Sequence, residues 1–309
     1  MRISLRQLQV FTAIADTGST SAGAEVVALS QSATSASLNE LESLLHTNLF
    51  DRVGKRLVLN DNGRLLLPQA RQMLDAAATM EGQFASGMDG AGLRIGASTT
   101  IGNYLLPAIL AVTLTRESDQ SGAHPLVTIA NTADIAIGVA NFALDMGLIE
   151  GPAHEPDLQV EPWLVDELVI VASPEHAIVR SGVPRKQKPE TLRRAAWLLR
   201  ERGSGTREAV EHVLLPHLHE LRAAAEFGSA EAIKHGAAAG LGLACLSRVV
   251  VQDLLSTGQL VELQTTLPPL TRHFYLIHHR RKMLSVRLQG FLQQCRKWPE
   301  KLRSVATTH

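Results

Sequence analysis

The chain contains little cysteine: its 309 residues include only Cys245 and Cys295. Two cysteines are too few for the disulfide framework of a small secreted protein. No segment approaches the roughly 18 uninterrupted apolar residues of a membrane-spanning helix, and Met1 to Phe11 shows no secretory signal. We therefore expect a cytoplasmic protein with no membrane partner. The two thiols are expected to be inert, because one lies in an apolar predicted strand and the other in the last predicted helix.

An excess of charge of either sign is also missing. The chain carries 30 basic and 30 acidic side chains, and its formal net charge is +0. The overall charge thus gives no indication of a nucleic-acid partner, and that case must rest on local patterns. At this length we expect more than one domain.

Residue patterns of catalytic and metal sites are absent too. His217 and His219 are two positions apart, which places them on different faces of a helix, and no cysteine or carboxylate cluster completes a metal site. The segment 203–205 lacks the spacing of a nucleophile elbow and the lysine of a phosphate-binding loop. We predict a protein that is not an enzyme and that carries no metal and no cofactor.

The first sixty residues have the pattern of three short helices and a hairpin. The first helix ends at Gly18, Ser19 can cap a second helix that runs to about Leu29, and a third follows Ser30. Residues 52–59 alternate as a short hairpin. This order predicts a winged helix-turn-helix. The expected core positions of the third helix are Thr34, Leu38, Leu41 and Leu45.

A longer helix is predicted from Asn62 to about Ser86. Its apolar residues follow alternating steps of four and three, which is the seam of a coiled coil. We expect this seam to pair with a second copy of the chain; packing against its own chain is the alternative. Pro68 is expected to kink the helix, and Gly87–Gly92 reads as a flexible linker. The seam comprises Leu66, Ala70, Met73, Ala77, Met80 and Phe84.

Beyond Gly92 the pattern changes to alternating strands and helices, which predicts open, mostly parallel sheets with helices on both faces. Ligands of such sheets bind at the carboxyl ends of the strands. Strands are expected at 93–97, 127–130, 144–149, 168–172, 197–199, 243–246 and 274–278, and helices at 103–116, 206–219, 229–239 and 285–297.

The N-terminal sixty residues resemble the DNA-binding domain of LysR-type transcriptional regulators. Three motifs carry the resemblance: Leu5-Arg6-Gln7-Leu8 with Phe11, Ser30-Gln31-Ser32-Ala33-Thr34-Ser35 with Leu41-Glu42, and Leu49-Phe50-Asp51-Arg52 with Leu57 to Gly63.

The rest of the chain is similar to the effector domain of the same family. Four segments match it in the expected order: residues 96–107, 145–151, 202–207 and 239–242. The first of these is similar to a subset of regulators associated with sulfur metabolism or carbon fixation.

The resemblance implies an α/β multidomain protein that is a sequence-specific DNA-binding transcriptional regulator. Residues 1–61 form the winged helix-turn-helix and 62–89 the linker and dimerisation helix. Residues 90–309 form a two-lobed effector-binding domain resembling periplasmic binding proteins of type 2. Lobe I covers about 91–162 and 270–300, and lobe II about 163–269. Expected partners are double-stranded promoter DNA, a small effector bound between the lobes, RNA polymerase, and further copies of the chain in a dimer of dimers.

The recognition helix of such a domain enters the major groove by its N-terminal part. If the apolar stripe faces the core, five side chains point toward the DNA, while cations of the wing contact its backbone. The candidate DNA contacts are Gln31, Ser32, Ser35, Ala36 and Asn39 on the helix, and Arg52, Lys55 and Arg56 on the wing.

Two features predict weak DNA binding per head. Members of the family usually carry a proline, an arginine and a large apolar residue where this chain has Ser32, Ala36 and Thr20. Through residue 64, six basic residues (Arg2, Arg6, Arg52, Lys55, Arg56, Arg64) balance six acidic ones (Asp16, Glu25, Glu40, Glu42, Asp51, Asp61). Fewer cations weaken the salt-dependent part of DNA binding, so we expect a strong dependence on oligomerisation. Protein contacts alone are the alternative use of this domain.

Small polar residues stand where several predicted strands lead into helices, and there they favour an anionic ligand. The alternative is that each hydroxyl only caps its own helix. Arginines 200, 202 and 207 bracket the glycine loop; one can pair with an oxyanion, and a solvated basic surface is the alternative. The candidate effector contacts are Ser98, Thr99, Thr100, Asn131, Thr132, Glu150, Arg202, Ser204 and Thr206.

Hinge crossings between the lobes are expected around 162–166 and 267–271. Two other functions remain open: a cytoplasmic small-molecule-binding protein of the solute-binding fold with little DNA affinity, and an enzyme built on the same two lobes. The helical N-terminal domain argues against the first. The second lacks a convergent acid, base or nucleophile.

Overall fold

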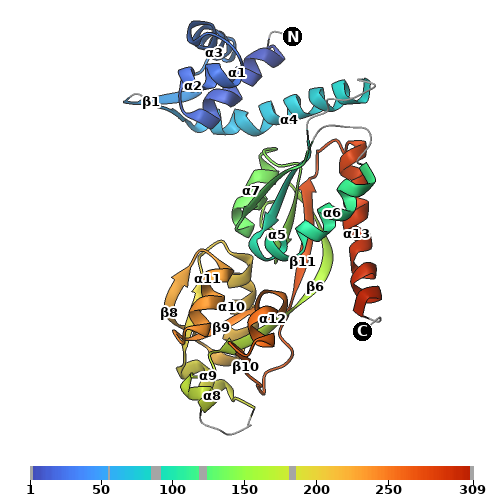
Figure 1. Cartoon of the computed structure of the whole chain (residues 1–309). Helices are drawn as coiled ribbons and strands as arrows, with labels where there is room; N and C mark the ends of the chain where they lie inside the picture. Colours follow the sequence, from blue (N-terminus) through green and yellow to red (C-terminus); the bar gives the residue numbers. More distant parts are fainter. Residues whose placement is uncertain (1–2, 55, 85–91, 118–123, 181–185, 307–309) are drawn as a thin grey trace.

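The computed structural model describes residues 3–54, 56–84, 92–117, 124–180 and 186–306. A small N-terminal domain is followed by a long helix and then by a larger domain of two lobes (Figure 1). The predicted wing residue Lys55 and most of the predicted linker 87–92 lie outside the described residues. Within the described part, no helix has the length and apolar character needed to cross a bilayer.

Serine caps begin each helix of the N-terminal domain. The side chains of Ser4, Ser19 and Ser30 accept backbone N–H groups in the first turns of α1, α2 and α3. Gly18 ends α1 with φ +71°, a left-handed conformation that favours glycine. The helices are α1 (Leu5–Thr17), α2 (Thr20–Val26) and α3 (Gln31–Leu45), so α2 ends before the predicted Leu29.

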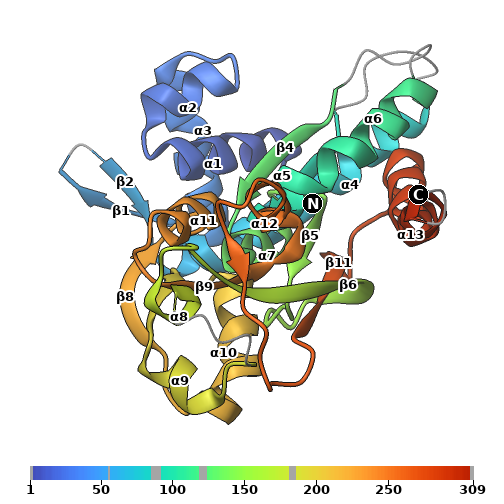
Figure 2. The same ribbon diagram turned by 60° about the horizontal axis from the view of Figure 1, so that its bottom comes forward.

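The wing is an antiparallel hairpin of β1 (Phe50–Val53) and β2 (Arg56–Leu59). It stands out at one side of the molecule (Figure 2). The predicted stripe of α3 faces inward, although Leu45 is only half-buried, and the core of this domain contains Leu8, Phe11, Ile14, Leu38, Leu41, Leu49 and Phe50. The predicted winged helix-turn-helix is confirmed.

The long helix α4 (Asp61–Phe84) continues through Pro68. Its first half packs on the N-terminal domain through Leu66, Ala70 and Leu74, and Arg71 forms an ion pair with Asp16 of α1. The predicted seam is therefore divided. Leu66 and Ala70 pack on their own chain, whereas Met73 and Met80 are 45% and 52% exposed. The side chain of Phe84 lies outside the described residues.

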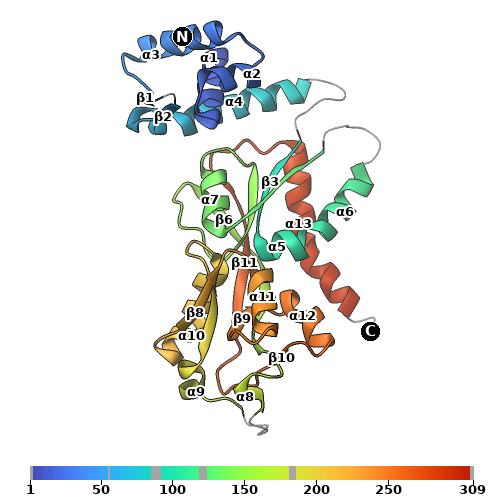
Figure 3. The ribbon, with the colours of Figure 1, turned by 60° about the vertical axis from the view of Figure 1, so that its left-hand side comes forward.

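Lobe I is built on three parallel strands. Helices α5, α6 and α13 pack on one face of the sheet and α7 on the other (Figure 3). The strands are β3 (Arg94–Ser98), β4 (Leu126–Ala130) and β5 (Met146–Glu150), and the helices are α5 (Thr99–Tyr104), α6 (Leu106–Glu117), α7 (Thr132–Ala140) and α13 (Val286–Ala306).

Lobe II repeats the arrangement, with α10 on one face of its strands and α11 and α12 on the other. Its parallel strands are β7 (Ala196–Arg200), β8 (Arg222–Phe227) and β9 (Leu243–Ser247). Its helices are α8 (Ala177–Arg180), α9 (Pro189–Arg194), α10 (Gly205–Leu218), α11 (Ala230–Ala238) and α12 (Arg248–Ser256).

Two long antiparallel strands join the lobes: β6 (Leu158–Ala172) and β11 (Thr271–His279). The sheet order is β4-β3-β5-β11-β6-β9-β7-β8, and the short β10 (Val261–Glu262) also pairs with β6. The expectation of mostly parallel sheets thus holds within each lobe and is wrong at the junction. At this junction Arg272 lies directly opposite Asp166.

Two of the errors in the predicted secondary structure have a clear physical reason. The helix expected over 103–116 is two helices, α5 and α6, since Pro107 is tolerated only in the first turn of a helix. Strand β8 was missed because its sequence, RAAAEF, is rich in alanine, a strong helix former. Pairing with β7 outweighs that preference.

Candidate DNA interface and effector site

The outer face of α3 carries the predicted base contacts. Ser32, Ala36 and Asn39 are exposed, whereas Ser35 is half-buried. The exposed Gln31 donates its side-chain amide to the hydroxyl of Thr20 on α2, 3.1 Å away. Thr20 is one of the departures from the usual family pattern, and its hydroxyl accepts this hydrogen bond from Gln31. The exposed face of α3 carries no lysine or arginine, and Glu40 on it is acidic.

On the wing, Arg52 and Arg56 are exposed. They belong to neighbouring strands of the hairpin, where Arg52 pairs with Leu57 and Val53 with Arg56. Exposed guanidinium groups on a projecting hairpin are suited to phosphate contacts, which position a protein on DNA without reading its sequence.

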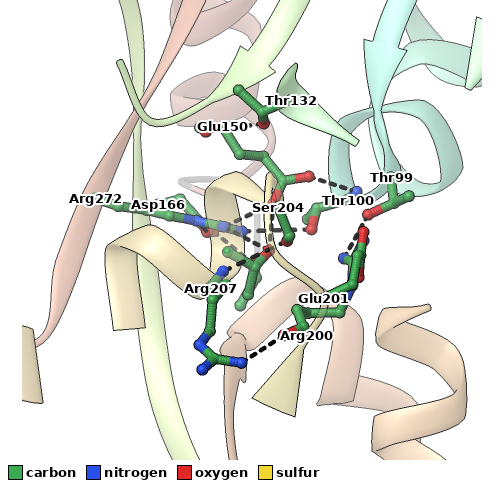
Figure 4. A network of polar contacts seen from close by, with 12 residues as sticks. Thr99, Thr100, Thr132, Glu150, Asp166, Arg200, Glu201, Ser204, Arg207 and Arg272 are labelled. Atoms are coloured by element: carbon green, nitrogen blue, oxygen red, sulfur yellow. Dashed lines mark hydrogen bonds and ion pairs between the residues drawn. The ribbon is translucent and has the colours of Figure 1, made fainter. Parts of the chain in front are cut away.

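Two of the predicted effector residues, Thr100 and Thr206, meet at the carboxylate of a third, Glu150, at the end of β5 (Figure 4). The backbone N–H of Thr100 donates to Glu150 Oε1 at 2.7 Å. Arg272 donates to Glu150 Oε2 at 2.6 Å, and the hydroxyl of Thr206 donates to the same oxygen. The side chain of Glu150 is 2% exposed. The junction between the lobes is thus a dry polar cluster.

Arg272 is the cation of this cluster. It lies at the start of β11, with its side chain 3% exposed, and its Nε donates to Asp166 Oδ2 at 2.7 Å while its Nη1 donates to Glu150. The hydroxyl of Ser247 donates to the other oxygen of Asp166 at 2.6 Å. One guanidinium therefore faces two carboxylates, one on β5 and one on β6.

The two carboxylates have opposite pKa shifts. Burial alone would raise the pKa of Glu150, but the charge of Arg272 and the hydrogen bonds from Thr206 and Thr100 outweigh it, so the pKa is lowered. For Asp166, burial is the largest cause and the pKa is raised, despite Arg272 and Ser247. Of the two carboxylates, Glu150 is consequently the one whose ionised form is favoured by its surroundings.

Other contacts hold the lobes together around this cluster. Arg200 of β7 donates to the hydroxyl of Thr99 at 2.8 Å, and its guanidinium also pairs with the neighbouring Glu201. The hydroxyl of Tyr104 on α5 donates to Glu231 of α11. These pairs join lobe I to lobe II, so the two lobes are in direct contact around the cluster.

The structure brings some predicted effector residues into the cluster and leaves others out. Thr132 donates its hydroxyl to the carbonyl oxygen of Glu150 at 3.1 Å. Ser98 is buried without a hydrogen bond of ordinary geometry to any described residue, although its hydroxyl contributes to lowering the pKa of Glu150. Asn131 and Ser204 cap α7 and α10, as the alternative interpretation held.

Arg202 is exposed on the loop before α10 and takes no part in the described contacts of the cluster. The arginines at the junction are Arg200 and Arg272. Sequence reasoning missed Arg272 and Asp166 as site residues. Both lie in or next to the expected hinge segments, and a charged side chain there, beside apolar strand residues, was the available signal.

Other candidate features lie away from the junction. A hollow of about 390 Å³ at the far end of lobe II is lined by His176 and Arg194, among others, and contains none of the predicted effector residues. Burial raises the pKa of both Cys245 and Cys295 to about 12. Within the described residues, no cluster of three His, Cys, Asp or Glu side chains is placed to hold a metal ion.

Comparison with known proteins assigns both halves of the chain. Residues 5–64 match the model for bacterial regulatory helix-turn-helix proteins of the lysR family, and residues 87–300 match the model for the LysR substrate binding domain. Over 296 residues the chain is 47% identical to the HTH-type transcriptional regulator YeiE of Escherichia coli K12, covering 96% of this chain and 98% of that protein.

Solved structures agree with this assignment. Full-length OxyR from Pseudomonas aeruginosa has a TM-score of 0.75 at 21% identity, covering 96% of this chain and 94% of that one, which shows the fold. The regulatory domain of Synechocystis CcmR, solved in complex with 2-PG, has a TM-score of 0.58 at 30% identity. It covers 67% of this chain and 96% of that one.

These matches favour a regulator over a small-molecule-binding protein with little DNA affinity, because the DNA-binding half is matched in its own right. They also confirm the expectation that the chain is not an enzyme, since its relatives are transcriptional regulators. The chain belongs to the LysR family: it is a DNA-binding transcriptional regulator with an effector-binding domain.

Proposed function

We propose that the effector is a small anion and that it binds at the junction of the two lobes. The observation that carries this proposal is the convergence of donors from both lobes on one carboxylate, with Arg272 as the cation. Donors of this kind in a dry site suit a carboxylate or another oxyanion. The CcmR regulatory domain was solved with a small molecule, 2-PG, which supports an effector of similar size.

The proposed response is a change in lobe closure that repositions the DNA-binding heads. Lobe II holds lobe I through pairs such as Arg200 with Thr99, which an opening of the lobes would break. An effector can shift this equilibrium only if it binds one of the two states more tightly. Because α4 contacts lobe I directly, a change in the effector domain has a path to the DNA-binding domain.

The active form is proposed to be a dimer of dimers that binds promoter DNA in the cytoplasm and contacts RNA polymerase, with no cofactor beyond the effector. The exposed Met73 and Met80 on α4 support pairing of the linker helices, because large apolar side chains at coiled-coil spacing are usually buried by a partner. Two linked heads then bind neighbouring half-sites more tightly than one.

Recognition of DNA is assigned to α3 and the wing. Asn39 is exposed and can read a base edge, while Arg52 and Arg56 contact phosphates. Since this domain has few cations for DNA, we propose that affinity depends on oligomerisation more than on a single head.

The test is a gel shift and footprint of the full-length protein on the intergenic DNA upstream of its own gene. Binding is measured across a salt series, without and with organic acids, phosphate and sulfur oxyanions. We expect specific, salt-sensitive retardation and a footprint that changes with at least one anion. If only cationic or apolar compounds change the footprint, the effector is not an anion.

A further inference from the structure

Glu150 is held in the way that proteins hold a bound anion. Its two oxygens receive a backbone N–H, a hydroxyl and a guanidinium, from Thr100, Thr206 and Arg272. Such short contacts to an ionised group in a dry site are the strong class of hydrogen bond. Thr100 and Thr206, which the sequence predicts as effector contacts, instead donate to the carboxylate of the chain itself.

The carboxylate also joins the parts that must move. Oε1 accepts from Thr100 of lobe I, and Oε2 accepts from Thr206 of lobe II. Arg272, on the strand that joins the lobes, donates to the same Oε2 at 2.6 Å. A free anion that closes two lobes has to make contacts of this kind on both sides.

The backbones of the two lobes lie close together beside Glu150, which leaves little free space next to its side chain. A Cβ on Gly205, at the start of α10, would lie 1.6 Å from the carbonyl oxygen of Glu150 and 2.5 Å from Thr132 Oγ1. The backbone of lobe II therefore lies directly on the end of β5.

We propose that Glu150 is a tethered carboxylate ligand of the junction: its side chain occupies the anion position between the lobes, and a free anion binds there by displacing it. This inference rests on the proposed function in one respect, namely that the effector is an anion taken at this junction. It adds that the site is closed and satisfied by the chain itself before any effector arrives.

The tether has a consequence for affinity. A ligand attached to its own site competes at an effective concentration on the order of millimolar or above. A free monocarboxylate offers the same contacts without that advantage, so it binds the wild-type chain weakly. An effector that displaces the Glu150 side chain must make contacts beyond those of one carboxylate. The built-in ligand thereby selects against simple organic acids.

Replacement of Glu150 by alanine makes the inference testable. The change removes a CH₂–COO⁻ group, whose free counterpart is acetate, and Asp166 remains to neutralise Arg272. Full-length wild-type and Glu150→Ala proteins are titrated with sodium acetate by calorimetry, with sodium chloride at equal ionic strength as the reference. We expect Glu150→Ala to bind acetate at least about tenfold more tightly than the wild type, because it lacks the tethered competitor.

Two further variants make the result specific. Glu150→Gln fills the same space without the charge, so acetate finds no room, and we expect no gain in binding. Glu161→Ala removes an exposed carboxylate that pairs with Arg296, so we also expect no gain. If Glu150→Ala folds poorly, its thermal unfolding is followed with and without acetate, and a selective rise of the melting temperature with acetate is the supporting result.

Equal acetate affinity in the wild type and in Glu150→Ala overturns the inference, as does the absence of both acetate binding and acetate stabilisation in the variant. The footprint experiment separates this from the proposed function. A wild-type footprint that responds to an anion while Glu150→Ala gains no acetate binding leaves the function intact and removes the tethered ligand. Acetate binding by Glu150→Ala without any anion response of the wild type keeps the tethered ligand and removes the anionic effector of the proposed function.

Discussion

Asp75 of the linker helix accepts a hydrogen bond from Lys282 of the effector domain at 2.6 Å, across 207 positions of the chain. Lys282 also lies 2.9 Å from Asp145, and Arg94 donates to both carboxylates. Two cations and two carboxylates thus alternate where α4 meets lobe I. The side chain of Lys282 is only 5% exposed, so its ammonium group is shielded from water and salt.

The first prediction concerns coupling through this cluster. Asp75→Asn leaves Lys282 and Arg94 with one carboxylate instead of two, and we expect a loss of about 1–3 kcal/mol in the stability of the α4 contact. A double-mutant cycle with Lys282→Met, followed by thermal unfolding, measures the interaction of the pair. The control is Asp61→Asn, which removes a carboxylate of the exposed pair with Arg64. Additive losses from the two single changes contradict direct coupling.

The second prediction is a pH dependence that arises from Asp145. Burial alone would raise the pKa of Asp145, but its hydrogen bond to Arg94 and the charge of Lys282 outweigh that effect, so the pKa is lowered in the folded protein. The folded state therefore binds this proton less strongly than the unfolded chain does. The stability that Asp145 contributes is fully present above its unfolded pKa of about 3.9 and is lost as pH falls through the lower folded value.

Urea unfolding of the wild type and Asp145→Asn between pH 2.5 and 7 measures this effect. We expect a constant difference between the unfolding midpoints at neutral pH, which shrinks as the pH falls below about 4 because the wild type then loses the same interaction. A difference that stays unchanged down to the lowest pH at which the wild type is folded means that Asp145 does not titrate as described.

Local chemistry made the helix ends of the N-terminal domain predictable. Ser19 and Gly18 act through neighbours in sequence, as an N-cap and a left-handed helix end. The effector junction was predictable only in part. Glu150 follows an apolar strand and was identified, whereas Arg272 acts on it from 122 positions away, through a pairing that exists only in the folded sheet.

The roles of the small polar residues show the same division. A hydroxyl at the start of a helix is compatible both with capping and with ligand binding. Ser204 caps its own helix, and Thr206, two residues later, contacts Glu150. The burial that distinguishes the two roles depends on the packing of lobe II against lobe I, which no local pattern contains.

The third prediction concerns the thiols. Burial raises the pKa of Cys245 and of Cys295 to about 12, so at pH 8 only a very small fraction is thiolate, the reactive form. We expect no labelling of the native protein by iodoacetamide at pH 8 over an hour, and labelling of both residues after denaturation in urea. Mass spectrometry measures both. Rapid labelling of either cysteine in the native chain contradicts the prediction, because it requires an accessible thiolate.

The fourth prediction tests lobe closure. Gly205→Ala places a methyl group within 1.6 Å of the carbonyl oxygen of Glu150, so the start of α10 must move away from lobe I. We expect amide exchange at Thr100 and in the first turn of α10 to increase by about tenfold or more, since each tenfold corresponds to about 1.4 kcal/mol of lost protection. Gly290→Ala is the matched control, because its Cβ meets nothing within 4 Å. Equal exchange in both variants contradicts close packing at the junction.

The last prediction addresses DNA affinity. Position 36 is exposed on α3, and an arginine there restores the cation that the family usually carries. We expect Ala36→Arg to raise affinity for the upstream DNA and to steepen the dependence of log K on log salt by about 0.9, the value for one additional phosphate contact. Gln252→Arg, on exposed α12 of lobe II, adds the same charge away from the DNA-binding domain. If the two variants change the salt slope equally, the gain is a general charge effect, and α3 does not lie against DNA as proposed. If only Ala36→Arg steepens it, the shortage of cations on α3 limits the affinity of each head, and linking two heads through α4 is the compensation available to the native chain.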